Sequence, residues 1–322
     1  MSDATADLDP AAGPGHRPAL AVFTHLACLD HDPGLGHPEN PARLAAVLDA
    51  LESGLPDLTW LEAPQALRSQ LSRVHTPALL AEVLDRHVEG HYRIDADTIM
   101  NNCSREAALR AVGAGVAAVD AVMSGSHRRA FCAVRPPGHH ATADIAMGFC
   151  LFNAVAVAAA HALEQHGLSR VVIADFDVHH GNGSQDIFQR DPRVMYLSSH
   201  QAPLYPGTGY HEERGVGNIL NAQLPPGSGS AAFRAAWSDA LLPAIDQFRP
   251  QLVLVSAGFD GHRLEPLADL NLETDDYTWL TAELLARAER HARGRIVSLL
   301  EGGYSLTALR ECALAHVRAL AV

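Results

Sequence analysis

The stretch RVVIADFDVHHGNG, residues 170–183, decides the fold. It joins a short, nearly continuous apolar run, 170–174, to a cluster of acids and histidines. Such a run is typical of a strand that is buried on both faces of a parallel sheet. Open α/β sheets place their functional sites at the carboxyl ends of such strands. The stretch therefore predicts both a buried parallel strand and a site at its end.

The same combination of an apolar run and a polar cluster recurs three more times along the chain. These further strand-like runs are 130–134, 252–256 and 295–300. Helical patterns at 105–123, 153–165, 231–248 and 278–292 separate the runs, after a first strand at 19–24 and a helix at 41–51. Alternating strands and helices predict a doubly wound α/β fold, a central and mostly parallel sheet flanked by helices. Its site is expected at the carboxyl ends of the strands.

Composition excludes two classes of partner. The chain has 322 residues, with 24 basic side chains, all of them Arg, against 37 acidic ones, and a formal net charge of −13. So acidic a chain lacks the basic stripe that binds nucleic acid by displacing counterions. Its longest apolar runs, such as 154–160, are shorter than the roughly 20 residues of a membrane span. We therefore expect neither nucleic acid nor a membrane as a partner.

The chain is expected to form one domain after a short leader. Residues 1–18 are rich in Ser, Asp, Ala, Pro and Gly and predict a flexible leader that lacks the pattern of a secretory signal. Residues 19–322 hold no linker or repeat and are expected to be a single domain. The five cysteines stand at unrelated spacings, which predicts buried thiols, no disulfide framework and a reducing cytoplasm as the location.

The acids and histidines at 175–183 suggest a metal site. If the strand continues through Asp175, Asp177 and His179, its period of two places these side chains on one face. Asp260, which follows another predicted strand, could complete the site. Three protein ligands with an open position are typical of a catalytic zinc, although iron or cobalt would also accept them. The structural alternative is that these acids cap helices or pair with Arg.

Two further clusters could supply acid–base chemistry. His139 and His140 follow a Pro-Pro-Gly turn at the end of a predicted strand, and two neighbouring imidazoles can divide proton abstraction and protonation between them. Tyr304 follows Gly302 and Gly303 and could donate its phenolic proton to a developing oxyanion.

Taken together, these motifs resemble a known family. They are RPPGHHA (135–141), GFCLFN (148–153), DFDVHHGNG (175–183), YPGTG (205–209), SAGFD (256–260) and LEGGY (300–304). Their types and order resemble the zinc-dependent histone deacetylase superfamily, and most closely its class II branch and the bacterial histone-deacetylase-like amidohydrolases. The resemblance implies the arginase–deacetylase fold. It also implies hydrolysis of linear amides, with acyl groups removed from lysine side chains of proteins or peptides.

The resemblance assigns roles by motif position. It implies that Asp177, His179 and Asp260 bind one zinc ion. It implies that His139 and His140 form the base and acid pair, with His140 transferring the proton.

Supporting and substrate-binding roles follow in the same way. The resemblance implies that Asp175 supports His139, that Asn182 supports His140, and that Tyr304 polarises the acyl oxygen. Asn at 182 is the class II form and is expected to give the imidazole of His140 a lower pKa than Asp would. The expected substrate-binding residues are Gly148, Phe149, Tyr205, Leu267 and Gly303.

The family also carries a monovalent-cation site and variable partners. The resemblance implies a structural K⁺ held, largely through main-chain carbonyls, by Asp175, Asp177, His179, Ser198 and Ser199. It leaves open a homo-oligomer and a small acylated amine as the substrate.

Three alternatives remain open at the level of the sequence. A two-metal ureohydrolase of the arginase type would need a second Asp where this chain has Gly181. An acetylpolyamine amidohydrolase would carry Glu at the tunnel mouth, where the motif register places Leu267 and where Glu265 stands two residues earlier. A non-catalytic acyl-lysine binder would need a broken site.

Overall fold

A computed structural model describes residues 20–322 of the chain, and the expected leader at 1–18 lies outside the described residues. The central element is an eight-stranded sheet in the order β2-β1-β5-β10-β9-β6-β7-β8, and every neighbouring pair of strands in it is parallel. Its strands are β1 (Leu20–Thr24), β2 (Thr59–Glu62), β5 (Arg129–Cys132), β6 (Val171–Asp175), β7 (Val194–Gln201), β8 (Ile219–Leu224), β9 (Leu252–Ala257) and β10 (Ile296–Leu300). The predicted α/β class with a parallel sheet is confirmed.

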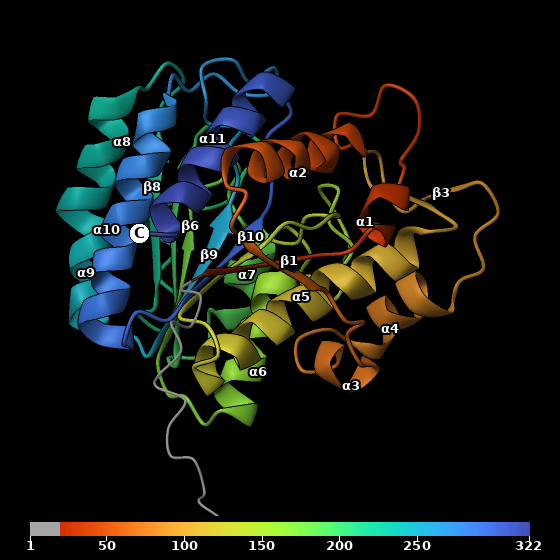
Figure 1. The fold of residues 1–322 in the computed structure, drawn as a ribbon, viewed down its shortest axis with the longest axis horizontal. Helices are drawn as coiled ribbons and strands as arrows, with labels where there is room; N and C mark the ends of the chain where they lie inside the picture. Colours follow the sequence, from red (N-terminus) through yellow and green to blue (C-terminus); the bar gives the residue numbers. More distant parts are fainter. Residues whose placement is uncertain (1–19) are drawn as a thin grey trace, which may run out of the picture.

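Helices cover both sides of this sheet (Figure 1). They are α1 (Ala27–Asp30), α2 (Ala42–Gly54), α3 (Arg68–Leu71), α4 (Pro77–Leu80), α5 (Ser104–Ser124), α6 (Ala154–Gln165), α7 (Asn182–Phe188), α8 (Ser230–Ala236), α9 (Leu242–Phe248), α10 (Thr274–Ala292) and α11 (Leu306–Leu320). Helices α5 and α6 pack against each other, while α10 and α2 both pack against α11. A separate antiparallel hairpin joins β3 (His91–Arg93) to β4 (Ile99–Asn101).

The four predicted strand runs become neighbours in the centre of the sheet. Strands β5, β10, β9 and β6 are adjacent, and every residue in them is buried. Full burial on both faces explains why these strands read as continuous apolar runs instead of alternating patterns. Because all four are parallel, their carboxyl ends meet at one edge, and this edge carries the polar clusters.

The elements that the sequence analysis missed lie mostly outside this centre. Strands β2, β7 and β8 and helix α11 were not identified. The single helix expected over 231–248 is divided into α8, a π-helical turn η2 (Trp237–Leu241) and α9. Pro243 stands at the start of α9 and has no N–H to donate to the preceding turn, which accounts for the interruption.

Helix α5 qualifies the expectation about apolar segments. By length and composition alone it could cross a membrane, and 67% of its most apolar window is buried within the fold. Arg110 and Asp120 interrupt its continuous apolar run, so α5 passes this criterion through its average composition and not through an uninterrupted apolar stretch. Its apolar face packs on β1, β5 and α6, and Gly113 lies so close to Pro64 that a Cβ would come within 1.8 Å of the Pro64 carbonyl oxygen.

Both ends of the described chain lie near the start of β5. Leu20 begins β1 beside Arg129, the first residue of β5. The Arg129 guanidinium donates hydrogen bonds to the carbonyl oxygens of Leu320, at 2.8 Å, and Val322. These contacts stand at the amino ends of the parallel strands, opposite the edge with the polar clusters.

A buried ion cluster ties the loop after β5 to the start of α2. Arg135 donates two charge-assisted hydrogen bonds to the carboxylate of Glu39, one of them at 2.7 Å, and Arg43 donates a third at 2.9 Å. All three side chains are fully buried. Although burial raises it, the pKa of Glu39 is held well below its usual value by the charge of Arg135. The cluster is therefore ionised inside the fold.

Glu39→Gln should destabilise the protein by about 3–5 kcal/mol, because it leaves buried guanidinium groups without their counter-charge. Glu62→Gln is the matched control, since Glu62 is 77% exposed in its ion pairs with His25 and Arg110. The control should change the free energy of unfolding by about 1 kcal/mol or less. Urea unfolding of both variants measures the difference. Equal changes in the free energy of unfolding would show that the buried ion cluster contributes no more to stability than an exposed ion pair.

Candidate functional site

The centre of the site is a cluster of two carboxylates and one imidazole. His179 Nδ1 lies 3.1 Å from Asp177 Oδ1 and 3.1 Å from Asp260 Oδ2. One ligand atom from each of the three residues lies within 4.8 Å of the other two, a spacing that could hold a metal ion. Asp177 and Asp260 are fully buried, and His179 is 8% exposed. The structure thus brings together the three residues that were predicted as zinc ligands.

The local backbone differs from the expected continuous strand. Strand β6 ends at Asp175 and bends follow at residues 177–179, so the strand does not continue to His179 as the period-of-two argument required. Side-chain oxygens fix the bends instead: Asp177 Oδ1 accepts from the N–H of His179 at 2.9 Å, and Asp260 Oδ1 accepts from that of Val178 at 2.9 Å. These hydrogen bonds orient the side chains of Asp177 and His179 towards Asp260, although the backbone there is not a strand.

Two glycines allow the carboxylates to approach so closely. A Cβ at Gly258 would lie 1.9 Å from Asp177 Oδ2, and one at Gly302 would lie 2.1 Å from Asp260 Oδ2. The Gly302 N–H also donates to Asp177 Oδ2 at 2.8 Å. A side chain at either position would displace a carboxylate, so the motifs SAGFD and LEGGY require glycine at these places for steric reasons.

The charges of the cluster favour a cation. Burial lowers the pKa of His179, but its hydrogen bonds and charge interactions with Asp177 and Asp260 raise it to about 10. Two buried carboxylates without a positive neighbour would carry a large desolvation cost. Two carboxylate oxygens and one imidazole nitrogen also form a donor set that zinc accepts. The residues present therefore fit a divalent metal ion.

The histidine pair stands beside this cluster. The rings of His139 and His140 are 4.1 Å apart, and His139 Nε2 lies 3.8 Å from Asp177 Oδ1. His139 Nδ1 lies 3.0 Å from Asp175 Oδ2, and His140 Nδ1 lies 2.8 Å from Asn182 Oδ1. Asp175 and Asn182 thus occupy the supporting positions that were expected of them.

The two histidines have opposite electrostatic environments. Burial lowers the pKa of His139, but the charges of Asp175 and Asp177 raise it well above its usual value. Burial lowers the pKa of His140 well below its usual value, and the charges of His139 and His179 lower it further. A carboxylate supports one ring and a neutral amide the other, so the pair offers one cationic and one neutral imidazole.

A cavity of about 220 Å³ leads to the cluster. It is lined by Asp97, His140, Gly148, Phe149, His179, Leu204, Tyr205, Leu267 and Tyr304. Four of the five predicted substrate-binding residues are therefore in its wall. The fifth, Gly303, is not among the lining residues; its carbonyl accepts a hydrogen bond from Arg43 Nε at 2.6 Å.

Residues distant in sequence hold Tyr304 in place. Arg43 lies over the Tyr304 ring, 4.8 Å from its centroid, and donates to the carbonyl of Glu301 at 2.5 Å. Glu265 Oε2 accepts from the N–H of Tyr304 at 2.9 Å and from that of Ser305 at 3.3 Å. Burial raises the pKa of Tyr304 well above its usual value, so its hydroxyl keeps its proton. The sequence analysis gave no supporting role to Arg43 or Glu265.

Glu301 is a third residue whose role was missed. Its Oε2 accepts from the N–H groups of Gly138 at 2.6 Å and His139 at 3.2 Å, and its Oε1 accepts from Ser256 Oγ at 3.1 Å. It thereby joins the loops after β5 and β10 to the end of β9. Its position in LEGGY, directly after an apolar run, was the one signal in the sequence.

Two of the five residues expected at a monovalent cation, Asp177 and His179, belong to the metal cluster, and Asp175 ends the strand that leads to it. Ser198 and Ser199 are buried in β7, and Ser198 pairs in register with Asp175 of β6. Ser198 Oγ lies 2.9 Å from His200 Nδ1, and Ser199 Oγ accepts from the Trp237 indole at 2.9 Å. Both hydroxyls thus have protein partners.

Comparisons with known proteins agree with the fold and indicate the family. The sequence profile of the histone deacetylase domain matches residues 37–320. A histone deacetylase-like amidohydrolase of Pseudomonas aeruginosa is 41% identical over 88% of this chain and 77% of its own length. The human polyamine deacetylase HDAC10 is 38% identical over 88% of this chain and 44% of its own length. The crystal structure of the HDA15 HD domain superposes with a TM-score of 0.89 at 33% identity, covering 95% of this chain and 88% of that one.

The burial of Glu265 predicts that the stability of the protein depends on pH. Burial raises the pKa of Glu265 from its usual 4.5 to about 7. Because the folded pKa is raised, the contribution of Glu265 to stability is complete below pH 4.5 and is lost as the pH rises through 7. Between these limits the wild type should lose about 3 kcal/mol of unfolding free energy relative to Glu265→Gln.

Urea unfolding from pH 4.5 to pH 8 measures this difference. Glu89→Gln, at a site 88% exposed, is the control and should run parallel to the wild type throughout. A constant difference between the wild type and Glu265→Gln would show that Glu265 does not titrate in this range.

Proposed function

This chain belongs to the histone deacetylase family, and we propose that it removes acetyl or other acyl groups from lysine side chains of peptides or proteins. It is a deacetylase that acts on amide bonds other than peptide bonds. One observation supports the lysine assignment above others: the narrow cavity has Phe149 and Tyr205 in its wall and His140, His179 and Tyr304 among its lining residues. An acylated lysine side chain matches this lining, because it has a linear apolar stem with an amide at its tip.

We propose Asp177, His179 and Asp260 as the ligands of one zinc ion. The family is zinc-dependent, and the buried donor set fits this ion. Zinc held there would lower the pKa of a bound water towards about 7 and polarise the acyl oxygen. Gly258 and Gly302 leave the carboxylates room to turn towards the ion.

The histidine pair would move the protons of the reaction. His140, whose Nδ1 is held by the Asn182 amide, lines the cavity and is proposed to take the proton of the attacking water and deliver it to the leaving amine. His139, held by Asp175, does not line the cavity and is proposed to stabilise the charge that develops beside it. The unlike supports of the two rings favour this division of labour.

Tyr304 would hold the oxyanion. Arg43 and Phe149 both contact its ring at the cavity wall, and its hydroxyl stays protonated as a donor. A donor positioned before the reaction stabilises negative charge that develops on the acyl oxygen. Arg43 and Glu265 act on Tyr304 as positioning residues, because they hold its ring and its backbone.

The remaining cavity residues would bind the substrate. Phe149 and Tyr205 are proposed to pack on both sides of the acylated stem, while the Gly148 carbonyl accepts the substrate amide N–H. Leu267, 38% exposed, stands at the cavity mouth, and Gly303 is proposed to contribute through the loop that carries Tyr304.

Three further assignments rest on the family and the composition. We propose a structural K⁺ near Asp175, Ser198 and Ser199, supported by their burial and their neighbouring positions in β6 and β7. We propose a cytoplasmic location, supported by five free cysteines. A homo-oligomer remains a proposal.

A second candidate function is the deacetylation of a small acylated amine. Similarity to a polyamine deacetylase supports it, as does the carboxylate of Asp97 at the cavity, which could attract a cationic substrate. The apolar Leu267 at the mouth offers no charge to a distal ammonium group. We therefore place acyl-lysine first.

Tyr304→Phe should fold normally and lose about 10²–10³-fold in kcat, because one oxyanion donor is removed. Tyr210→Phe is the control, since Tyr210 is 52% exposed and does not line the cavity. Acetate release from acetyl-lysine peptides by zinc-loaded protein, with a chelated blank, measures both. Full turnover by Tyr304→Phe would reject the role of Tyr304. Zinc-loaded wild type that binds the peptide without releasing acetate would instead indicate a non-catalytic binder.

Leu267→Glu should shift the substrate preference towards acetylated diamines. A carboxylate at the mouth would attract a distal ammonium group by roughly 1 kcal/mol at 4 Å in water, which is about a fivefold change in relative kcat/KM. Leu264→Glu is the control, since Leu264 is 43% exposed and lies outside the lining residues. Competition between N-acetylputrescine and an acetyl-lysine peptide measures the shift. A wild type that already prefers the diamine would overturn the lysine assignment.

A further inference from the structure

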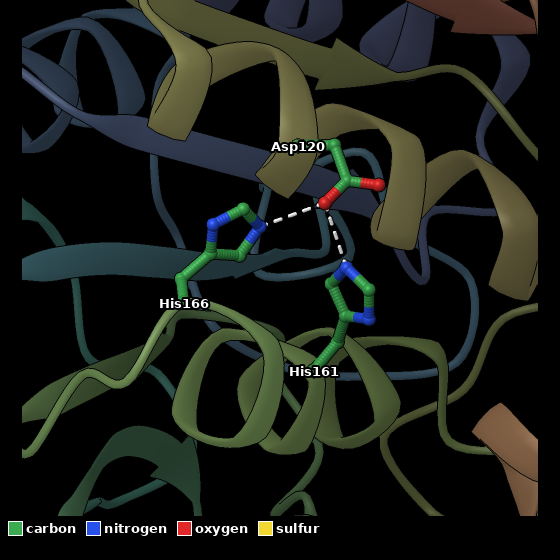
Figure 2. A group of neighbouring side chains, drawn as sticks. All are labelled: Asp120, His161 and His166. Carbon is green, nitrogen blue, oxygen red and sulfur yellow. Dashed lines mark hydrogen bonds and ion pairs between the residues drawn. The ribbon is translucent and has the colours of Figure 1, made fainter.

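A second group of metal-binding side chains lies outside the proposed active site, between α5 and α6. Asp120 of α5 faces His161 of α6 and His166, the first residue after α6, and Asp120 Oδ1 lies 2.7 Å from the Nε2 atom of each ring (Figure 2). One ligand atom from each of the three residues lies within 4.8 Å of the other two. Among the described residues, only this group and the proposed catalytic cluster meet that condition.

The scaffold under this group is rigid, and the group is open to solvent. A Cβ at Gly115 of α5 would lie 3.4 Å from the Ala158 side chain and 3.4 Å from the Ala154 carbonyl, so the two helices pack closely. The side chains of Asp120, His166 and His161 are 53%, 24% and 6% exposed. Two of the ligands thus stand on closely packed helices and the third directly follows one of them, at a place that an ion from solution can reach.

We propose that Asp120, His161 and His166 form a second binding site for a divalent transition-metal ion such as zinc. Two imidazole nitrogens and one carboxylate oxygen suit Zn²⁺, Ni²⁺ or Cu²⁺, and water would fill the remaining positions. The present separations of 2.7 Å are those of hydrogen bonds, so an ion would displace the shared protons and move the ligand atoms apart. The partly exposed Asp120 has room for that movement.

This site is distinct from the proposed catalytic zinc. Asn153, the N-cap of α6, donates to the carbonyl of Ala141 at 3.1 Å, beside the histidine pair. His166 stands at the other end of the same helix, about 20 Å away at 1.5 Å per residue. The two clusters share no residue, so binding at one can be removed without touching the other.

The charge of Asp120 suits a cation. Its side chain is 53% exposed, and two imidazole rings face it, so its negative charge is accommodated by solvent and by these neighbours. The carboxylate is therefore available as a ligand.

Arg73 competes with the metal ion for His161. Its Nη1 lies 2.8 Å from His161 Nδ1, and its Nε lies 2.9 Å from Glu164 Oε2. A guanidinium can only donate, so Nδ1 must accept and the ring proton sits on Nε2, where it bonds Asp120. A metal ion on Nε2 requires that proton to leave and a neutral ring to carry its proton on Nδ1, facing Arg73. Arg73 must then turn aside, which weakens metal binding.

The experiment counts zinc ions on metal-stripped, full-length protein by equilibrium dialysis against Zn²⁺. The wild type should bind one ion more than His166→Gln or Asp120→Asn, and the two variants should keep their deacetylase activity. Arg73→Gln should bind the extra ion about tenfold more tightly than the wild type, because an amide oxygen can accept the Nδ1 proton. His211→Gln is the control: His211 pairs with exposed Glu212 and should keep the wild-type count.

The outcomes separate this site from the catalytic one. Equal zinc counts in the wild type, His166→Gln and Asp120→Asn would overturn the proposal, as would an Arg73→Gln variant with unchanged affinity. Loss of the extra ion in His211→Gln as well would indicate adventitious surface binding and would also overturn it. If Asp177, His179 and Asp260 do not bind zinc, the wild type and all variants would each bind fewer zinc ions by the same number. The difference in bound zinc between the wild type and His166→Gln would then be unchanged.

Discussion

The burial of two carboxylates next to each other is the constraint on which the centre of this structure depends. Asp177 and Asp260 are fully buried and face the same imidazole nitrogen. Such a pair is tolerated only where a cation and several N–H donors surround it. The glycines at 258 and 302, the N–H donors from the two loops after β6 and β10 and the adjacency of four parallel strands all serve that requirement.

Further buried polar residues surround this pair and bind the backbone of the loops that carry the site. Glu301 binds the backbone of the histidine pair, and Arg43 binds the carbonyls of Glu301 and Gly303. Glu39 holds Arg43 and, through Arg135, the loop that precedes the histidines. The histidine pair and the loop that carries Tyr304 therefore rest on a buried ionic frame.

The sequence alone predicted which residues meet at the ends of the central strands, but it did not predict the buried ionic residues that support them. Continuous apolar runs identify buried strands, and parallel strands bring their ends together, so Asp177, His179 and Asp260 could be grouped in advance. Arg43 lies 260 positions from Gly303, and no local pattern links them. Edge strands β2 and β8 carry partly exposed residues and lack the continuous apolar signal of the centre. The bends after Asp175 depend on side-chain hydrogen bonds, which periodicity does not report.

The anchoring of the last residues beside the first strand has a practical consequence. Arg129 ties the carbonyls of Leu320 and Val322 to the amino edge of the sheet, where β1 also begins. The cavity opens at the carboxyl edge of the same strands. A surface, label or second enzyme joined through Val322 would therefore stand behind the sheet and leave the cavity mouth free for large acylated substrates. The molecule is thus suited to oriented immobilisation.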